Sequence, residues 1–390
     1  MIISICKGIG SPTDSSIFTK ILMVRRTYII YLILIAFISC KANQKERLIF
    51  KKNQRKYFTS VTSKKLQIDS TSIRALEIYD NYIAYAGSNG HYGVLIFDYI
   101  QSENNVNSIV ISDRYDSSVT SLGINPSFRS LAITDSKVFF LSIGSPALLY
   151  SYNISTKKID QVYEDLDQRN FYDSMSFWNS QEGIAIGDPI ENCLSILITR
   201  DGGNSWDKIS CNNFPNSLEG EAAFAASDTN IKVIGNKTWI VSGGGASRIF
   251  YSPDKGITWE VYSTPLLQGK STQGAYTMDF YNDKSGIIYG GDYTMPFQNI
   301  SNIASTIDGG KTWHLRASGS NDGYKSCVQY VPNSNGNEIV AMGFTGITYS
   351  SNGGNSWTKL SNEAFLSFRF INDTTAIASG TNKLAFLEFK

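Results

Sequence analysis

The sequence predicts an all-β fold in which seven similar sheets form a closed ring. An eight-residue turn motif occurs four times, with its tryptophans 44 to 54 residues apart. Seven stretches with strand-like alternation also recur, and each leads into a second apolar stretch that ends at Gly or another small residue. Repeated units of this length are typical of four-stranded β-propeller blades. The sequence therefore predicts a seven-bladed β-propeller.

Each predicted blade opens with an inner strand. These seven strands are expected at residues 72–76, 127–131, 174–177, 222–225, 276–280, 326–330 and 367–371. The second strands are expected at residues 82–87, 138–142, 183–187, 238–243, 286–290, 338–343 and 375–380. A third strand at 384–389 ends the chain and leaves the last blade one strand short. Residues 56–68 alternate like a strand, and we expect them to join the last blade as its outer strand and close the ring.

The repeated motif is Ser or Thr, any residue, Asp or Asn, any residue, Gly, any residue, Ser or Thr, and Trp. In such a turn the Asp or Asn side chain accepts hydrogen bonds from backbone amides, Gly supplies a positive φ, and Trp anchors the turn in the core. We therefore expect structural turns in outer hairpins, remote from the central channel. The key residues are Asp201 with Trp206, Asp254 with Trp259, Asp308 with Trp313, and Asn352 with Trp357.

This motif resembles the Asp-box, or BNR, repeat of sialidase-superfamily β-propellers. The chain as a whole resembles the photosystem II stability/assembly factor-like propellers, and residues 219–227 and 87–90 are similar to those of non-photosynthetic bacterial lipoprotein members. The resemblance implies a chaperone-like or scaffolding role, in which a rigid ring presents one face to another protein. Such members are often labelled oxidoreductase or glycosyl hydrolase, but no nucleotide fingerprint, flavin site or metal set supports the first label.

The composition disfavours several other functions. The 390 residues include 35 basic and 34 acidic side chains, so no global field attracts polyanions, and we expect no nucleic-acid partner. The chain has only two histidines, which disfavours a multi-histidine metal centre. Residues 243–245 are three glycines without a following Lys-Ser/Thr, which predicts a tight loop and no phosphate cradle. We therefore expect neither a metal nor a cofactor.

The N-terminus has the pattern of a bacterial lipoprotein signal. Arg25 and Arg26 precede an apolar run at residues 28–38, which is too short to cross about 30 Å of hydrocarbon. The run ends at Cys40 after a small residue, which resembles the lipobox, and the resemblance implies that Cys40 carries lipid. An uncleaved anchor or a chance apolar segment are the alternatives. We expect a signal at residues 1–40, with Met23 as an alternative start, a polar tether at 41–54 and the propeller at 55–390.

Three arginines occupy the same position in three inner strands. Arg74, Arg129 and Arg369 each follow Ser and an apolar residue, in blades 1, 2 and 7, which adjoin in a closed ring. Equal positions on equivalent strands should bring the three guanidiniums into one sector of the channel, where they could bind a carboxylate or phosphate. The alternative is that each arginine pairs with an acid of its own blade or with loop carbonyls.

Other polar residues are expected on the same face. They are Asp188, Glu219, Glu221, Arg248, Asp292 and Tyr293. An arginine cluster with carboxylates and a tyrosine is what a sialidase-like glycosidase requires, so a carbohydrate-active hydrolase is the alternative function. The sialidase pattern Phe/Tyr-Arg-Ile-Pro is absent, however, and residues 127–130 are its nearest approach.

Cys193 and Cys211 lie almost symmetrically about the first turn motif, so they should face each other across one hairpin. An oxidising compartment would permit a disulfide there, and two free buried thiols are the alternative. We expect, overall, a monomeric, lipid-anchored, non-catalytic scaffold in the bacterial cell envelope. It would face the periplasm and bind an envelope protein or an anionic ligand.

Overall fold

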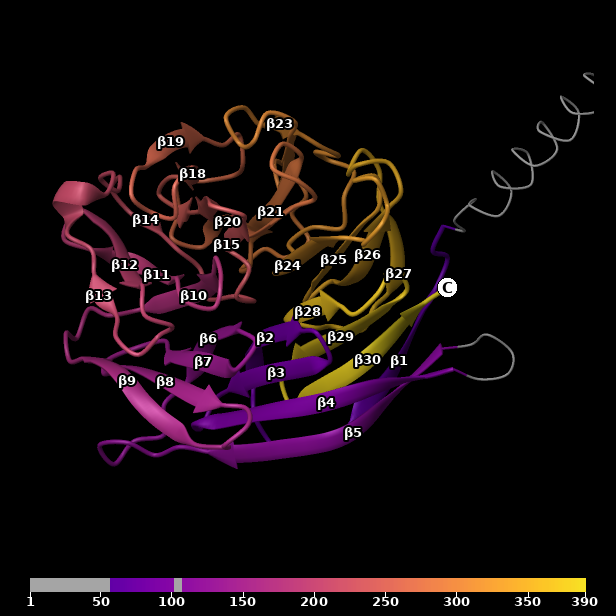
Figure 1. The fold of residues 1–390 in the computed structure, drawn as a ribbon. Coiled ribbons are helices and arrows are strands. Elements are labelled where there is room, and N and C mark those ends of the chain that lie inside the picture. Colours follow the sequence, from indigo (N-terminus) through magenta and orange to yellow (C-terminus); the bar gives the residue numbers. More distant parts are fainter. Residues whose placement is uncertain (1–56, 102–106) are drawn as a thin grey trace, which may run out of the picture. The chain divides into compact units, whose positions relative to one another are not determined.

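The computed structural model describes residues 57–101 and 107–390 of the chain, and the unit at Phe58–Lys390 is a ring of seven antiparallel blades (Figure 1). Each blade contains four strands, which confirms the predicted seven-bladed β-propeller. The predicted signal, the tether and Cys40 lie outside the described residues. No helix in the described ranges is long and apolar enough to cross a membrane.

The strands follow one another blade by blade. Blade 1 consists of β2 (Ile73–Tyr79), β3 (Tyr82–Gly87), β4 (His91–Gln101) and β5 (Asn107–Ser118), and blade 2 of β6 (Phe128–Ile133), β7 (Lys137–Ser142), β8 (Ala147–Asn153) and β9 (Ile159–Asp165). Blade 3 consists of β10 (Tyr172–Phe177), β11 (Gly183–Ile190), β12 (Cys193–Thr199) and β13 (Asp207–Lys208), and blade 4 of β15 (Ile231–Ile234), β16 (Lys237–Val241), β18 (Arg248–Ser252) and β19 (Glu260–Ser263). Blade 5 consists of β20 (Gln273–Phe280), β21 (Gly286–Asp292), β22 (Ile303–Thr306) and β23 (His314–Leu315), and blade 6 of β24 (Cys327–Tyr330), β25 (Ile339–Gly343), β26 (Gly346–Ser350) and β27 (Thr358–Ser361). Blade 7 consists of β28 (Ser367–Phe370), β29 (Thr375–Gly380), β30 (Lys383–Phe389) and β1 (Val61–Leu66). Two short strands, β14 (Glu221–Ala222) and β17 (Gly243–Gly244), and the 3-10 helix η1 (Cys211–Asn213) complete the secondary structure of the described residues.

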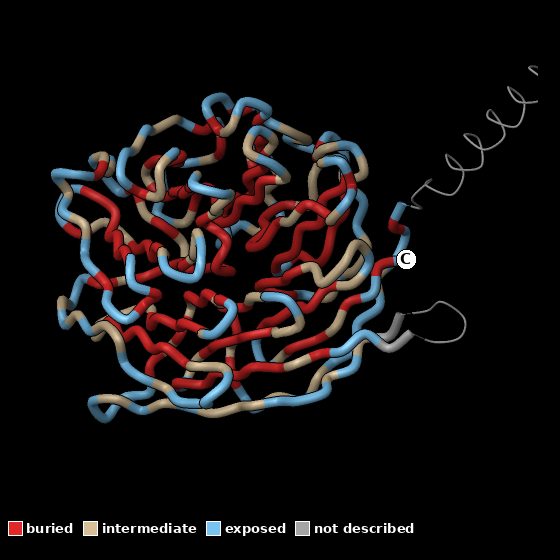
Figure 2. The backbone as a smooth tube through the Cα atoms, in the orientation of Figure 1, coloured by how far each residue is buried: buried red, intermediate tan, exposed pale blue. Residues whose placement is uncertain are grey.

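The core lies between the blades. Seven apolar clusters each join one pair of neighbouring blades, and the one between blades 7 and 1 brings Ile377 and Leu384 against Ile73 and Leu76. Middle strands such as β3 and β12 are apolar and buried along nearly their whole length because both of their faces meet a neighbouring blade. Outer strands are largely exposed (Figure 2). The ring is therefore held together by interfaces between blades.

The first strand closes the ring. β1 pairs antiparallel with β30, from Val61 opposite Phe389 to Leu66 opposite Leu384. The amide of Thr59 also donates to the carbonyl of Lys390, at 2.6 Å. The pairing confirms that an N-terminal strand completes the last blade. The ends of the propeller unit are thereby joined by backbone hydrogen bonds.

The prediction for the inner strand of blade 4 was wrong. That strand is β15 (Ile231–Ile234), whereas the predicted stretch 222–225 begins at the last residue of β14 and continues into residues that belong to no strand. β14 pairs with β17, which joins the sheet of blade 5 through Gly243 opposite Gly274. The close approach requires glycine, because a Cβ on Gly274 would lie 2.4 Å from the Gly243 Cα. Small residues thus let residues 222–230 leave the sheet and enter the channel.

The four repeated motifs lie between the third and fourth strands of blades 3 to 6. In the first, the Thr199 hydroxyl donates to Asp201 at 2.9 Å, and Asp201 accepts from the amide and the hydroxyl of Ser205 at 3.0 and 2.7 Å. The amide bond recurs at the other three turns, and the hydroxyl bond recurs at Asp254 and Asp308. At the fourth turn the side-chain amide of Asn352 instead donates to the hydroxyl of Ser356 at 2.9 Å. Trp206 is buried in the cluster between blades 2 and 3. These side chains are committed to fixing their own turns.

A disulfide joins Cys193, at the start of β12, to Cys211, in η1, with the two Cα atoms 5.5 Å apart. The two alternatives that the sequence leaves open are thus resolved in favour of the bridge. It ties the loop after β13 back to blade 3.

Candidate functional site

Residues 223–230 run through the central channel, and we call them the channel segment. Seven of the eight are buried. The segment precedes the inner strand of blade 4. It forms hydrogen bonds to each of the other six blades, at residues that lie in the innermost strand or directly adjoin it. The partners are Arg74, Leu131, Ser174, Met278, Ser326 and Ser367. The segment therefore closes the channel and leaves a cavity at each end of the inner strands.

The three predicted arginines all contact this segment. The guanidinium of Arg129 donates to the carbonyl of Ala225 at 3.4 Å, and that of Arg74 donates to the carbonyl of Ala226 at 3.1 Å. Arg369 donates to the next two carbonyls, those of Ser227 and Asp228, at 3.3 Å each. Four consecutive carbonyls thus accept from three arginines, but the arginines do not all reach the same cavity.

Arg74 and Arg129 line one cavity, which we call the arginine cavity. It has a volume of about 410 Å³. The channel segment contributes its alanines and Phe224, and the rest of the lining is mainly aromatic. In the described part of the chain, neither guanidinium forms an ion pair, and each donates instead to a backbone carbonyl. Two cations therefore face the cavity, and neither has an ion-pair partner among the described residues.

A β-bulge places these side chains. Where β2 pairs with β3, Ile73 lies opposite Gly87 and Ala75 opposite Ala86, so Arg74 is the extra residue of a bulge. Arg129 in β6 is the extra residue of an equivalent bulge. The extra residue of a bulge is free of the ladder and re-aims its side chain. The equivalent bulge residues in β10 and β20 are Asp173 and Tyr276.

Arg369 lies elsewhere because β28 has no bulge. It sits opposite Ile377 in regular register, whereas the residue before Arg74 lies opposite the terminal Gly87 of its neighbouring strand. The two arginines are therefore out of phase along the channel axis. Arg369 is buried and ion-paired with Glu77, with its Nε 2.7 Å from Oε1. The expectation that three guanidiniums share a cavity is thus corrected to two.

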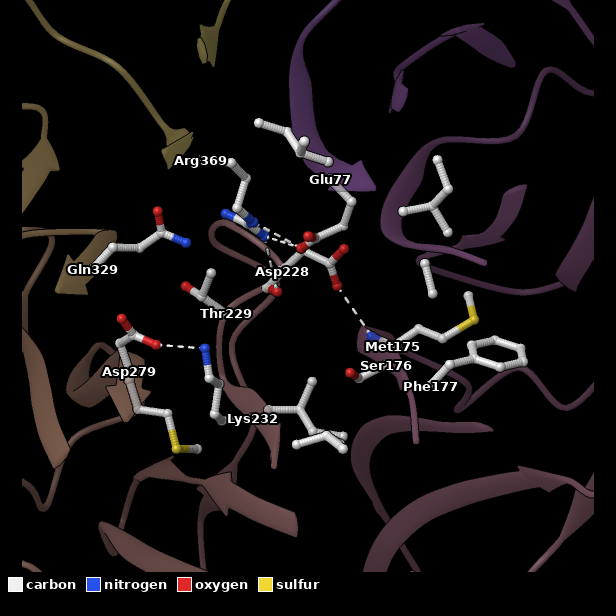
Figure 3. Close-up of a pocket in the computed structure, with 16 residues that line it drawn as sticks. Glu77, Met175, Ser176, Phe177, Asp228, Thr229, Lys232, Asp279, Gln329 and Arg369 are labelled. Atoms are coloured by element: carbon white, nitrogen blue, oxygen red, sulfur yellow. Dashed lines mark hydrogen bonds and ion pairs between the residues drawn. The ribbon is translucent and has the colours of Figure 1, made fainter. Parts of the chain in front are cut away.

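Figure 3 shows the second cavity, at the other end of the channel segment, with a volume of about 210 Å³. Its charges are paired with one another: Arg369 with Glu77, and Lys232 with Asp279 at 2.7 Å. Asp228 is fully enclosed and accepts from Leu131, Ser174 and Met175. These charges therefore satisfy each other and brace the inner strands.

The electrostatics of the arginine cavity favour an anion. Burial lowers the pKa of Arg74. Burial, and then the charge of Arg74, lower the pKa of Arg129 to about 10. Burial raises the pKa of Asp188, which also lines the cavity, to about 6, and the amide of Ala223 that donates to it opposes this shift. A bound anion would stabilise both guanidiniums in their charged form.

Asp173 lies behind the cavity wall and was missed by the sequence analysis. Its side chain is fully buried, and neither carboxyl oxygen has a hydrogen bond of normal geometry within the described residues. Burial, followed by the charge of Asp188, raises the pKa of Asp173 well above its usual range, despite the opposing influence of Arg129. The neutral form of Asp173 is therefore favoured. A neutral Asp173 does not balance the positive charges of Arg74 and Arg129.

Aromatic side chains form the apolar part of the cavity. The rings of Phe224 and Tyr276 stack with their centroids 4.0 Å apart, and Tyr276 meets Tyr324 edge-on at 4.9 Å. Phe344 stacks on Tyr324 at 5.4 Å, and Tyr293 meets Tyr276 edge-on at 6.3 Å. Of these five, sequence analysis found only Tyr293. The others could have been found only through the bulge position and through the path of the channel segment.

The remaining predicted residues lie outside the arginine cavity. Arg248 is ion-paired with the buried Glu221 and donates to its Oε1 at 2.9 Å. Asp292 is buried, and it accepts from the amide and the hydroxyl of Thr294 at 2.9 and 2.6 Å. Glu219 is exposed on the preceding loop. Arg248, Glu221 and Asp292 thus hold their own loops in place, and none of these four residues lines the arginine cavity.

The carboxylates bear on the alternative hydrolase function. A glycosidase of the usual kind needs two carboxyl groups on opposite sides of the scissile bond, whereas a sialidase uses a tyrosine as its nucleophile. Of the described residues that line the arginine cavity, Asp188 is the one acid, since Asp173 is enclosed behind it. Nor do the described residues contain a cluster of three His, Cys, Asp or Glu side chains placed to hold a metal ion. The described lining of the arginine cavity thus lacks the carboxyl pair of the usual glycosidases, but it holds two arginines, Asp188 and Tyr293.

The fold and the cavity define a β-propeller with a closed channel and a cationic, aromatic pocket on one face. No protein-family model and no curated protein matches the sequence. Solved structures do match its fold. "YCF48 bound to D1 peptide" is 13% identical with a TM-score of 0.57, over 84% of this chain and 95% of that one. "YCF48 from Cyanidioschyzon merolae" is 10% identical with a TM-score of 0.55, over 85% and 98%.

A third similar structure is "Crystal structure of RRP9 WD40 repeats", which is 11% identical with a TM-score of 0.53 over 85% of this chain and 98% of that one. At these identities, the likeness establishes the propeller fold alone. It agrees with the fold that the resemblance to assembly factor-like propellers implies.

Proposed function

We propose that this protein is a non-catalytic scaffold that binds a protein partner through an anionic group held in the arginine cavity. The observation that carries the proposal is the pair Arg74 and Arg129. Burial disfavours both charges, repulsion from Arg74 further disfavours the charge of Arg129, and neither arginine has a counter-ion within the described residues. A carboxylate or phosphate would relieve this repulsion and accept several charge-assisted hydrogen bonds.

Two observations support a protein as the partner. The cavity combines its two cations with aromatic rings, which suits a peptide that presents an acidic group beside apolar side chains. A protein of the same fold is solved with a bound peptide, which is the kind of ligand that we propose here. The rigid ring would then serve as a platform for holding or assembling the partner.

We also propose that the protein is a lipid-anchored monomer of the cell envelope that faces the periplasm. This part rests on the basic, apolar and small-residue pattern before Cys40. The test is fractionation of the wild type and the Cys40→Ser variant, together with mass spectrometry of the mature chain. Release of the variant into a soluble or unprocessed form would support the anchor, and a mature wild-type chain without lipid would contradict it.

The binding site is tested by co-purification of the tagged full-length chain from membranes. Wild type is compared with the double variant Arg74→Ala and Arg129→Ala, and with Arg200→Ala as the control. Arg200 lies in the outer turn of blade 3, away from the arginine cavity. Its replacement removes a positive charge without changing the cavity. We expect the double variant to lose a partner that both other chains retain. Retention by the double variant, or no specific partner with wild type, would contradict the proposal.

A further inference from the structure

The loop between β21 and β22 exposes four large apolar side chains. Tyr293 is 45% exposed, Met295 54%, Phe297 77% and Ile300 50%. We call residues 293–300 the apolar loop. Single exposed apolar residues are ordinary, but a contiguous group of them on a soluble protein usually marks an interaction site.

The apolar loop is held in a fixed conformation. Within it, the amide of Met295 donates to the carbonyl of Asp292 at 3.0 Å, and the amide of Gln298 donates to the carbonyl of Met295 at 2.9 Å. The side-chain amides of Asn299 and Asn321 donate to each other's backbone carbonyls at 3.2 and 2.8 Å. The backbone is therefore ordered before any partner arrives, which lowers the entropy cost of binding.

The apolar loop adjoins the arginine cavity. Tyr293 belongs to both. The carbonyl of Pro296 accepts from the amide of Tyr324, whose ring lines the cavity, at 2.8 Å. Phe344, which stacks on Tyr324, lines the cavity and is itself 46% exposed. Apolar surface thus continues from the cavity wall onto the loop.

We propose that the arginine cavity and the apolar loop form one docking surface for an extended partner segment that carries an acidic group and, a few residues away, large apolar side chains. The acidic group would face Arg74 and Arg129, and the apolar side chains would pack on Met295 and Phe297. This inference rests on the proposed function and names the class of partner. The partner segment needs an acidic group because the cavity presents two arginines. It needs apolar side chains because the apolar loop exposes apolar surface that the partner would cover.

Two other occupants fit less well. A loop that enters an anionic membrane surface usually carries Lys or Arg beside its apolar residues, and residues 293–302 contain neither. A second copy of the propeller that docked symmetrically on this face would bring the arginines of the two cavities close together. The repulsion between their positive charges would oppose such a dimer. Both occupants remain measurable outcomes of the test.

The test is selection of random twelve-residue peptides displayed on phage against the immobilised full-length chain. It is run with wild type, with Arg74→Ala/Arg129→Ala, with Met295→Ser/Phe297→Ser, and with Ile307→Ser as the control. Ile307 is 75% exposed on the outer turn of blade 5, so it matches the loop residues in character but not in place. Affinities of the selected peptides, vesicle flotation and sedimentation are measured for each chain.

We expect wild type and Ile307→Ser to select peptides enriched in both acids and large apolar residues. The arginine variant should lose the acid enrichment, and the loop variant should lose the apolar enrichment and bind wild-type peptides about tenfold more weakly. A loop variant that selects and binds as wild type does would overturn this inference and leave the proposed function standing. No selected peptide, or a loop variant that changes only vesicle binding or self-association, would also overturn it.

Discussion

The guanidinium of Arg369 and the carboxylate of Glu77 form an ion pair that joins the innermost strands of blades 7 and 1, with Nε 2.7 Å from Oε1. The same guanidinium donates to the carbonyls of Phe368, Ser227 and Asp228. The closing blades and the channel segment therefore share a single cation. Arg369 has a structural role, although it occurs in the same sequence pattern as Arg74 and Arg129.

Replacing Arg369 by Ala should lower the free energy of unfolding by about 3 kcal/mol. This lies at the lower end of the range for a broken buried ion pair, because the Glu77 side chain remains 28% exposed. Arg129→Ala, which removes one hydrogen bond of 3.4 Å, should cost about 1 kcal/mol or less. Urea denaturation of both variants checks the difference. Equal losses would show that the two arginines do not differ in role.

Anion binding at the arginine cavity should strengthen as the pH falls from 7 to 5. Burial raises the pKa of Asp188 to about 6, so this carboxyl is mostly neutral below pH 6 and negatively charged above it. A negative charge beside the arginines should weaken the binding of an acidic peptide by about fivefold, which corresponds to about 1 kcal/mol, the repulsion of two charges about 4 Å apart in water.

Titrations of an acidic peptide at several pH values measure this dependence. Asp188→Asn should bind with the same affinity at pH 5 and pH 7, because its side chain carries no charge at either. If the variant keeps the full pH dependence of the wild type, another group is responsible.

The repeated turns should depend on the acceptor oxygens of the Asp and less on its charge. Asp308→Ala leaves the amides of Lys311 and Thr312 without their acceptor and should lower the free energy of unfolding by about 1 to 3 kcal/mol. Asp308→Asn should cost less, because Asn352 already accepts from the amide of Ser356 in the fourth turn. Thermal or urea unfolding measures the free energy of unfolding of both variants. Equal losses of stability for Asp308→Ala and Asp308→Asn would contradict this account.

The disulfide should contribute about 3 kcal/mol to the free energy of unfolding. Cys193 and Cys211 are 18 residues apart, and a bridge across a loop of that length restricts the unfolded chain by about this amount. Replacing both by Ala should lower stability accordingly under oxidising conditions. A reducing agent should bring wild type to the level of the variant. If it has no effect on wild type, the bridge does not stabilise the protein.

The sequence by itself determined the seven-bladed ring and its closure by residues before blade 1. These features depend on local patterns. They are the alternation of apolar residues and the turn motifs, such as the one at Asp201, in which the hydrogen-bonded residues are two to four positions apart. Local interactions of this kind are written directly into neighbouring residues, so a single sequence reveals them.

Only the tertiary structure decided which side chains share the arginine cavity. Arg74, Arg129 and Arg369 look alike in sequence, but two lie in bulges and one lies in a regular strand, and an extra residue in the pairing changes where a side chain points. The path of the channel segment depends on hydrogen bonds between residues up to about 150 positions apart, such as that from Arg74 to Ala226. Such contacts follow from strand register and ring closure, and no local pattern in the sequence records them.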